Sequence, residues 1–353
     1  MNARSGIIYQ NEINDILSAG YQWEKLKNKT ILISGATGSV GQVIIDVLMR
    51  LNLNSDYKCN IIAISRNAAK AEKMFYDYWH NEYFKYLSTD VSETVDIDEK
   101  IDYILHAASN THPLQYAQEP IETITTNIFG TYHLLSLAYK NNSEFLLFSS
   151  VEVYGENNTG IEMFSEKDMG YLNCATLRAG YPESKRLSES MCFAFAKQLD
   201  VKFKIARLTR VYGLTMSSQD SKAIAQFFSN GLNHENIILK SEGNQLYSYV
   251  YVMDCVSGIF AILLNGDNGE VYNISGTNSA VTLKDLAQMI AGEFGVSVVR
   301  ELPTQLEKEG FSRATKAVLN SEKLMSLGWS EKTSIKEGVK KIKDEEQNEK
   351  SRD

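Results

Sequence analysis

A tyrosine and a lysine stand four residues apart at the start of an apolar helix, in the run Tyr181-Pro182-Glu183-Ser184-Lys185. Four residues are about one helical turn, so both side chains lie on the same face. A lysine ammonium beside a phenol favours the phenolate and lowers the tyrosine pKa. Such a phenol can take the proton of a substrate hydroxyl while hydride leaves the same carbon. The spacing also fits an exposed surface pair, so this chemistry requires a dinucleotide site and a polar strand end nearby.

A glycine-rich turn after a short β-branched strand predicts the dinucleotide site. Thr30–Ser34 has the pattern of a buried parallel strand, and Gly35–Gly41 leads from it into an apolar helix. Glycines permit close approach of a pyrophosphate, which the helix N-terminus then faces. The residues expected to bind the cofactor here are Gly35, Thr37, Gly38, Ser39, Val40 and Gly41. The alternative is a βα turn without a ligand.

The residues at the ends of the second and third expected strands can contact the adenosine part of the cofactor, and they help to distinguish NAD from NADP. The strand Asn60–Ile64 ends at Ser65 and Arg66, with no acidic residue to accept hydrogen bonds from the adenosine ribose. Arg66 with Ser65 favours a 2′-phosphate and hence NADP, whereas an Arg66 that stacks on adenine or faces water leaves NAD open. Asp90 and Val91 end the third expected strand and can reach the adenine. Residues 68–86, between them, are expected to form an amphipathic helix.

Small and polar residues follow the fourth and fifth strands, where ligands sit in an open parallel sheet. The strand Ile101–Leu105 leads into His106-Ala107-Ala108-Ser109, whose small side chains leave room for a cofactor. His106 equally fits a structural role. The strand Glu144–Phe148 leads into Ser149-Ser150-Val151-Glu152. Ser150 can hydrogen-bond the reacting hydroxyl, and Glu152 is either an acid or base beside the substrate or a solvated loop carboxylate.

The order of elements predicts an α/β fold, a Rossmann-type doubly wound parallel sheet with a smaller C-terminal substrate lobe. The sixth strand is Lys204–Leu208, and shorter elements follow it. The expected parts are a leader helix at 1–28, a cofactor domain at 29–210, a mainly substrate-binding lobe at 211–342 and a disordered, charged tail at 343–353. Asn127, on an expected helix Ile121–Tyr139, either bridges backbone and solvent near the lysine or packs between helices.

Composition bounds the class of protein. The net charge of −8 does not favour non-specific nucleic-acid binding. The four cysteines form no CxxC and no metal-like spacing, so we expect reduced thiols, a cytoplasmic protein and no metal. The N-terminus lacks a basic-then-apolar signal pattern, and no apolar run approaches the ~20 residues of a membrane span.

With these motifs in this order, the chain resembles the extended short-chain dehydrogenases/reductases. Within them it resembles the NAD-dependent epimerase/dehydratase group, which acts on nucleotide sugars. The resemblance covers roughly residues 29–342. The matching residues are Gly35, Gly38, Gly41, His106-Ala107-Ala108, Asn127, Gly130-Thr131, the run Ser149 to Gly155, Tyr181, Lys185, Arg207, Val211-Tyr212-Gly213 and Leu327-Gly328-Trp329.

The resemblance implies a tightly held NAD or NADP and oxidation at sugar C4, with Tyr181 as the base. Lys185 would bind the nicotinamide ribose, and Ser150 would take the place of the family's serine or threonine. The small lobe would hold a nucleotide sugar, and the chain would form a homodimer through its long helices. Dehydration, decarboxylation or epimerisation would then follow at C5 or C6. The alternatives are an NADPH-dependent reductase of a keto-sugar or small ketone and a non-catalytic dinucleotide sensor.

Several positions separate the branches of this family. Glu152 resembles the glutamate of the dehydratases and UDP-glucuronate decarboxylases, and Val151 stands where 4,6-dehydratases carry an aspartic acid. Arg178, three residues before the tyrosine, resembles the decarboxylases. Tyr247 stands where that branch has an arginine, and Arg210 where many members have an asparagine. The expected substrate-binding residues are Ser109, Val151, Arg210 and Tyr247.

Overall fold

The computed structural model describes residues 3–158, 160–217 and 219–350. A seven-stranded parallel sheet forms its centre, in the order β11-β6-β5-β4-β1-β2-β3. The strands are β1 (Thr30–Ser34), β2 (Asn60–Ser65), β3 (Phe84–Ser88), β4 (Tyr103–His106), β5 (Glu144–Ser150), β6 (Lys202–Leu208) and β11 (Val271–Ile274). Their β-branched and aliphatic runs are buried because helices cover both faces. The predicted doubly wound α/β fold is confirmed.

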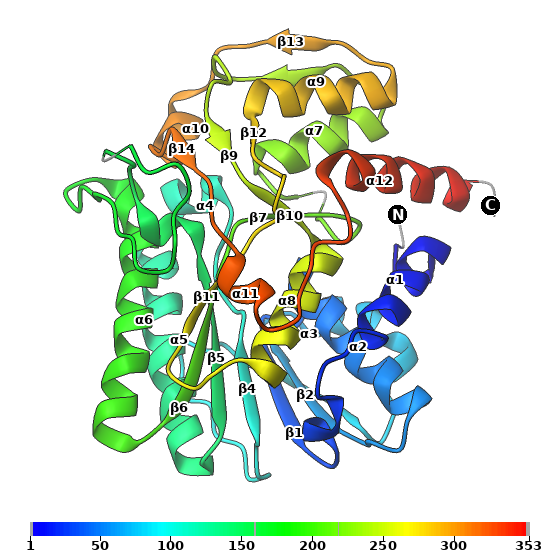
Figure 1. Ribbon diagram of the computed structural model, residues 1–353, viewed down its shortest axis with the longest axis vertical. Coiled ribbons are helices and arrows are strands. Elements are labelled where there is room, and N and C mark those ends of the chain that lie inside the picture. Colours follow the sequence, from blue (N-terminus) through cyan, green and yellow to red (C-terminus); the bar gives the residue numbers. More distant parts are fainter. Residues whose placement is uncertain (1–2, 159, 218, 351–353) are drawn as a thin grey trace.

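Two hydrophobic cores lie on opposite faces of the sheet. One is built with α1 (Ile7–Leu17), α2 (Ser39–Asn54) and α8 (Val252–Asn265). The other is built with α5 (Pro120–Asn141) and α6 (Gly180–Leu199), which run side by side in Figure 1. The long helices α5 and α6 were expected from their apolar periodicity, and α6 carries the predicted tyrosine and lysine.

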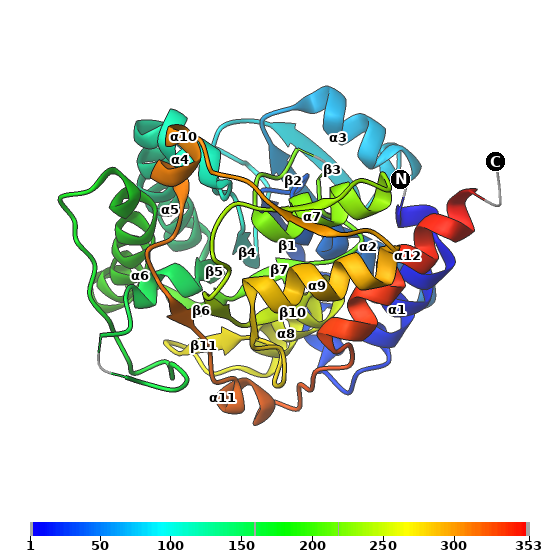
Figure 2. The same cartoon turned by 90° about the horizontal axis from the view of Figure 1, so that it is seen from above.

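A smaller lobe lies beyond the carboxyl ends of the parallel strands (Figures 1 and 2). Its strands form three short sheets, which pair β10 with β7, β13 with β8, and β9 with both β12 and β14. The strands are β7 (Arg210–Tyr212), β8 (Ile237–Leu239), β9 (Leu246–Tyr247), β10 (Tyr249–Tyr251), β12 (Val281–Thr282), β13 (Val298–Arg300) and β14 (Lys316–Ala317). The helices are α7 (Ala223–Leu232), α9 (Leu283–Phe294), α10 (Gln305–Gly310) and α12 (Ile335–Lys350), whereas α11 (Glu322–Met325) lies against β11 and α8 (Figure 1).

The expected boundary at residue 211 is wrong for three elements, namely α8, β11 and α11. β11 pairs with β6 in the central sheet, and α8 packs in the same core as α2. The chain therefore enters the lobe, returns to the first domain at α8 and β11, and enters the lobe again. Buried apolar runs such as Val271–Ile274 fit either a lobe strand or a central strand, so their pattern did not decide between the two.

The helix expected at 68–86 is also wrong. Ala68–Met74 forms the α-helix α3, Tyr76–Tyr78 adds a single 3-10 turn, and Phe84–Ser88 is the edge strand β3. Aromatic side chains between them contact one another: the ring of Phe75 lies 5.4 Å from that of Phe84, and the ring of Trp79 lies 5.3 Å from that of Tyr86. This aromatic packing outweighs the weak helical periodicity of the segment.

The expected disordered tail is a helix as far as the structure describes it. α12 extends to Lys350, and residues 351–353 lie outside the described residues. Glu345 is buried and accepts a hydrogen bond from the backbone N–H of Ile8. The contact joins α12 to the leader helix α1, which lies beside it in both views (Figures 1 and 2).

The leader helix α1 packs against the body. Arg4, just before it, donates to Asp46 of α2 at 2.7 Å. Glu12 on α1 pairs with Lys341 of α12 at 2.7 Å and accepts from the hydroxyl of Tyr251 at 3.0 Å. These contacts tie the cofactor domain to the C-terminal lobe.

Candidate active site

One large cavity, of about 1930 Å³, lies between the carboxyl ends of the parallel strands and the lobe. All four residues predicted to be catalytic line it, namely Ser150, Glu152, Tyr181 and Lys185. The other predicted site residues along it are Gly35, Thr37, Gly38, Ser39, Val40, Gly41, Ala107, Ser109, Ser149, Val151, Arg210 and Tyr247. The fold therefore brings together the glycine turn, the end of β5 and the start of α6, which are far apart in the sequence.

The geometry of the glycine turn fits a dinucleotide pyrophosphate. Gly35 has φ +71°, and a Cβ there would lie 2.7 Å from the backbone carbon of Ala107. A Cβ at Gly41 would lie 2.4 Å from the carbonyl oxygen of Gly35. α2 begins at Ser39 and has no side-chain cap at Gly38, so its first-turn N–H groups face the cavity without a capping side chain. Such a helix end is an anion site.

Seven of the predicted cofactor residues do not line this cavity: Ser65, Arg66, Asp90, Val91, His106, Ala108 and Asn127. The hydroxyl of Ser65 lies 3.1 Å from that of Tyr86, and the exposed Arg66 lies 3.9 Å from Asp90. Arg66 thus lies at the end of β2, between the carboxylate of Asp90 and solvent. Whether it meets a 2′-phosphate stays a prediction.

His106 and Asn127 serve the packing behind the cavity. The Nδ1 atom of His106 shares a 2.8 Å hydrogen bond with the hydroxyl of Ser34, and burial lowers the His106 pKa to about 3, so its ring is neutral. Asn127 accepts from Ser109 at 2.7 Å and donates to Ser184 at 2.9 Å. It therefore joins the loop after β4, through α5, to the helix of the tyrosine. Both residues fit the structural alternatives considered for them.

Tyr181 is buried at the floor of the cavity. Burial raises its pKa, and this outweighs the lowering by the nearby hydroxyl of Ser150. Ser150 and Tyr181 both line the cavity, so a substrate hydroxyl bound there could meet both. The sequence likewise predicted that the end of β5 would lie near the start of α6.

The expected lowering of the Tyr181 pKa by Lys185 is wrong. The ammonium of Lys185 donates to the carbonyl oxygen of Phe148 at 2.9 Å, and burial lowers the Lys185 pKa to about 8. After burial, the strongest influences on Tyr181 are Ser150, Glu152 and Arg178. Lys185 thus lies one turn from the tyrosine, as the spacing requires, but its charge is directed to the end of β5.

Glu152 is held between two arginines. Its Oε2 accepts from Arg178 at 2.9 Å, and its Oε1 lies 3.7 Å from Arg210. Burial raises the Glu152 pKa, but the two guanidinium groups outweigh it, so the pKa is below its usual value. Glu152 is therefore an ionised carboxylate and not a solvated loop residue. An ionised carboxylate fits a base or a fixed charge better than a proton donor.

The two arginines keep one donor each without a partner. Nη1 of Arg178 and Nη1 of Arg210 are buried and bond to no other described residue. The guanidinium carbon of Arg210 lies 3.4 Å from the centre of the Tyr247 ring, which orients it. Two cations against one carboxylate leave a net positive charge here. This positive charge suits an anion bound in the cavity, which both arginines line.

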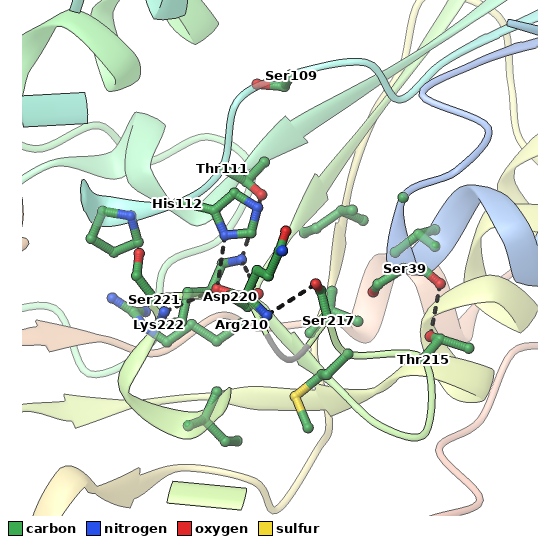
Figure 3. A pocket seen from close by; sticks show the side chains of 18 of the residues that line it. Ser39, Ser109, Thr111, His112, Arg210, Thr215, Ser217, Asp220, Ser221 and Lys222 are labelled. Atoms are coloured by element: carbon green, nitrogen blue, oxygen red, sulfur yellow. Dashed lines mark hydrogen bonds and ion pairs between the residues drawn. The ribbon is translucent and has the colours of Figure 1, made fainter. Parts of the chain in front are cut away.

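A second cluster joins two loops at the cavity wall. The Nδ1 of His112 lies 3.0 Å from Asp220, which also pairs with Lys222 at 2.8 Å (Figure 3). The hydroxyl of Thr215 donates to the carbonyl oxygen of Ser39 at 2.8 Å, which ties the same loop to the glycine turn (Figure 3). Thr215 and Asp220 thus bridge the lobe and the cofactor domain.

Sequence reasoning missed Tyr116 and the His112 cluster as site residues. Tyr116, on α4 (Pro113–Gln118), stacks on Tyr181 with ring centres 4.7 Å apart. Nothing local in the sequence marks it, because the contact depends on how α4 lies against α6. Arg178 was singled out only because its spacing from Tyr181 resembles the decarboxylase branch of the family. That spacing did not predict that Arg178 contacts Glu152 in the cavity.

The Rossmann-type sheet and this cavity define a nucleotide-dependent enzyme fold, and comparison with known proteins identifies the family. Residues 31–275 match the model of the NAD dependent epimerase/dehydratase family. The chain belongs to this family, as the resemblance predicted. Within the described residues, no group of His, Cys, Asp and Glu side chains could hold a metal ion, and no helix is long and apolar enough to cross a membrane.

Two of the similar curated proteins are UDP-glucuronic acid decarboxylases. The chain is 30% identical over 316 residues to UDP-glucuronic acid decarboxylase 1 of Xenopus tropicalis, which covers 89% of this chain and 71% of that protein. It is 29% identical to UDP-glucuronic acid decarboxylase 3 of Arabidopsis thaliana, over 88% of this chain and 87% of the relative.

Solved structures agree in fold. UDP-glucuronic acid 4-epimerase from Bacillus cereus, in complex with UDP-glucuronic acid and NAD, has a TM-score of 0.76 at 20% identity, over 90% of this chain and 99% of that one. dTDP-glucose 4,6-dehydratase from Bacillus anthracis, in complex with NAD, has a TM-score of 0.75 at 21% identity, over 91% and 98%. The fold is thus shared by enzymes of different reactions, so it does not select one.

Proposed function

We propose that this protein is a UDP-glucuronic acid decarboxylase: with bound NAD or NADP it oxidises C4 of the sugar and then releases C6 as carbon dioxide. The observation that carries the choice of a uronic acid is the pair of buried, unpartnered Nη1 atoms on Arg178 and Arg210. A sugar carboxylate would accept both. The names of the similar relatives support the same substrate.

Tyr181 and Ser150 would act on the C4 hydroxyl. Ser150 would orient the hydroxyl, and the phenol oxygen of Tyr181, once ionised, would accept its proton. The bound cofactor would supply the hydride acceptor and later return the hydride. The N–H groups at the start of α2 would hold its pyrophosphate, and Lys185, at the end of β5, would hydrogen-bond its ribose.

Decarboxylation then depends on the environment of C6. A C4 ketone accepts the electron pair left when the C5–C6 bond breaks, and C5 afterwards takes a proton. Arg178 and Arg210 would fix the carboxylate, while the ionised Glu152 keeps the two guanidinium groups in place. Val151 offers no acid for loss of a C6 hydroxyl, which speaks against a 4,6-dehydration.

Product mass tests the proposal. The purified protein is incubated with UDP-glucuronic acid and, separately, with UDP-glucose, and the nucleotide released on denaturation is identified as NAD or NADP. A loss of about 44 mass units from UDP-glucuronic acid, one carbon dioxide, supports decarboxylation. An unchanged mass with a new epimer would assign a 4-epimerase, and a loss of about 18 units a dehydratase. Inert protein with either sugar would favour a reductase or a sensor.

A further inference from the structure

The leader places one arginine at the outer end of the cavity. Arg4 lies before the residues that match the family model, which begin at residue 31, yet it lines the same cavity as Gly38 of the glycine turn. Its side chain is only 16% exposed. Asp46, on the helix that begins at this turn, lines the cavity as well. The leader is therefore part of the cavity wall, although the proposed reaction gives it no role.

Arg4 is fixed to α2 by the carboxylate of Asp46. Its Nε donates to Oδ2 of Asp46 at 2.7 Å, and its Nη2 donates to Oδ1. The hydroxyl of Tyr9, on α1, donates to the same carboxylate at 2.6 Å. Two parallel hydrogen bonds to one carboxylate set the plane of a guanidinium. Arg4 is thus oriented on the helix whose N-terminus would hold the pyrophosphate.

The same guanidinium packs on two aromatic rings of the segment that follows α3. Its central carbon lies 5.3 Å from the ring centre of Phe75 and 5.4 Å from that of Tyr78. The start of α1 accordingly lies close to the end of α3 (Figure 2). A cation is attracted to aromatic faces, and more strongly where water is excluded. Arg4 therefore joins α2 to the end of α3.

The helix α3 borders the expected adenosine end of the cofactor site and has few other attachments. It begins directly after Ser65 and Arg66, and Asn67 caps it by accepting from the N–H of Lys70 at 2.9 Å. Of its seven residues only Ala71 is buried. A short helix that buries so little apolar surface depends on specific contacts for its position. A shift of α3 would also displace the end of β2, where a Rossmann-type fold holds the adenosine ribose.

We propose that Arg4 is a positioning residue for the cofactor: it clamps the segment after α3 against α2, keeps the adenosine end of the dinucleotide site closed and so slows release of the cofactor. Arg4 acts through Asp46 and the rings of Phe75 and Tyr78, without contacting the cofactor itself. The inference rests on the bound dinucleotide of the proposed function and is independent of the sugar.

The test measures cofactor release with no sugar present. Protein loaded with NADH or with NADPH is mixed with an excess of the oxidised cofactor, and the change in nicotinamide fluorescence gives the dissociation rate. Arg4→Met combined with Asp46→Asn removes the clamp without leaving a buried charge unpaired. Arg4→Met alone is the second variant. Arg50→Gln is the matched control, because Arg50 of α2 donates to Asn14 of α1 at 2.9 Å but does not line the cavity.

We expect the double variant to release the cofactor about tenfold faster than the wild type, the size of effect that two shielded cation–π contacts allow. Amide hydrogen exchange of residues 68–78 should rise in the same variant, because α3 loses its tie to α2. Arg50→Gln should keep the wild-type values of both.

An unchanged dissociation rate in the double variant, or in Arg4→Met should the double variant not fold, would overturn the inference. An equal rise in Arg50→Gln would also overturn it, since the effect would then belong to the leader as a whole. A wild type that binds neither NADH nor NADPH would contradict the proposed function itself, and the inference with it.

Discussion

The guanidinium of Arg210, on β7, lies flat over the ring of Tyr247, on β9, with 3.4 Å between its central carbon and the ring centre. The contact leaves the edge of the guanidinium for Glu152 and for one free, buried N–H group. Where the resemblance to the decarboxylase branch implies an arginine, this chain has Tyr247, which contacts an arginine from a strand of another short sheet. The positive charge is thus kept at the site by a different residue.

Replacing Arg210 should weaken the binding of an acidic sugar selectively. We expect Arg210→Gln to raise KM for UDP-glucuronic acid at least tenfold, since a hydrogen bond to a charged group contributes about 1.5–3 kcal/mol. Binding of UDP-glucose, measured by calorimetry, should change little. Arg300→Gln, at an exposed pair with Glu242, serves as the control. Equal loss of both sugars would show that Arg210 does not meet the carboxylate.

Neutralising Glu152 should separate the two halves of the reaction. Glu152→Gln leaves Ser150 and Tyr181 in place but removes the charge that pairs with Arg178 and Arg210. We expect C4 oxidation, followed by the absorbance of reduced nicotinamide, to persist within about tenfold, while release of carbon dioxide falls at least about 100-fold, or roughly 3 kcal/mol. Unchanged release of carbon dioxide would reduce Glu152 to a structural carboxylate.

The buried Lys185 predicts a pH dependence of stability. Its pKa is lowered to about 8 by burial, so between pH 8 and its unfolded value the unfolded chain binds more protons than the folded chain. Stability should therefore rise with pH in this window, as the penalty for burying the ammonium disappears. Relative to Lys185→Met, the wild type should gain on the order of 2 to 3 kcal/mol between pH 7 and pH 10.

Urea unfolding of both proteins at the two pH values measures this difference. Buried tyrosines such as Tyr116 contribute equally to the two proteins, so their titration cancels in the comparison. A difference between wild type and variant that stays constant with pH would mean that the lysine is not desolvated.

We propose that the exposed apolar side chains of α5 and α6 mediate a homodimer. They include Ile121, Phe129, Tyr132, Leu187 and Phe193. We expect light scattering to give about twice the chain mass of 39.7 kDa for the wild type and the single chain mass for the pair Phe129→Glu and Leu187→Glu. Leu53→Glu, at an exposed leucine of α2, should leave the dimer intact. A wild type of single-chain mass would contradict the proposal.

Much of the fold followed from local patterns. The strands β1, β2, β4, β5 and β6, the glycine turn and the helices α5 and α6 were all predicted near their observed positions, because buried parallel strands and amphipathic helices leave strong periodic signals. The tail at 343–353 was misjudged although Ile335, Val339 and Ile342, just before it in α12, form a helical stripe, since their buried partners lie far away in the sequence. Glu345 gives no apolar signal at all, and its contact with Ile8 depends on the folded chain.

The sequence predicted which residues line the candidate site, but it did not predict their charge interactions. Ser150, Glu152, Tyr181 and Lys185 do meet at one cavity, as the carboxyl ends of parallel strands require. The direction of the Lys185 side chain, the pairing of Glu152 with two arginines and the stacking of Tyr116 depend on side-chain packing between distant elements. Spacing along the chain carries no information on any of these.

The central claim, that Tyr181 is the base for oxidation at C4, is tested most directly by rapid mixing of the cofactor-loaded protein with UDP-glucuronic acid. The absorbance of reduced nicotinamide is followed in the wild type and in Tyr181→Phe. We expect a transient signal in the wild type and a rate at least about 1000-fold lower in the variant, or roughly 4 kcal/mol, with the cofactor still bound. A signal of equal rate in Tyr181→Phe would contradict the account.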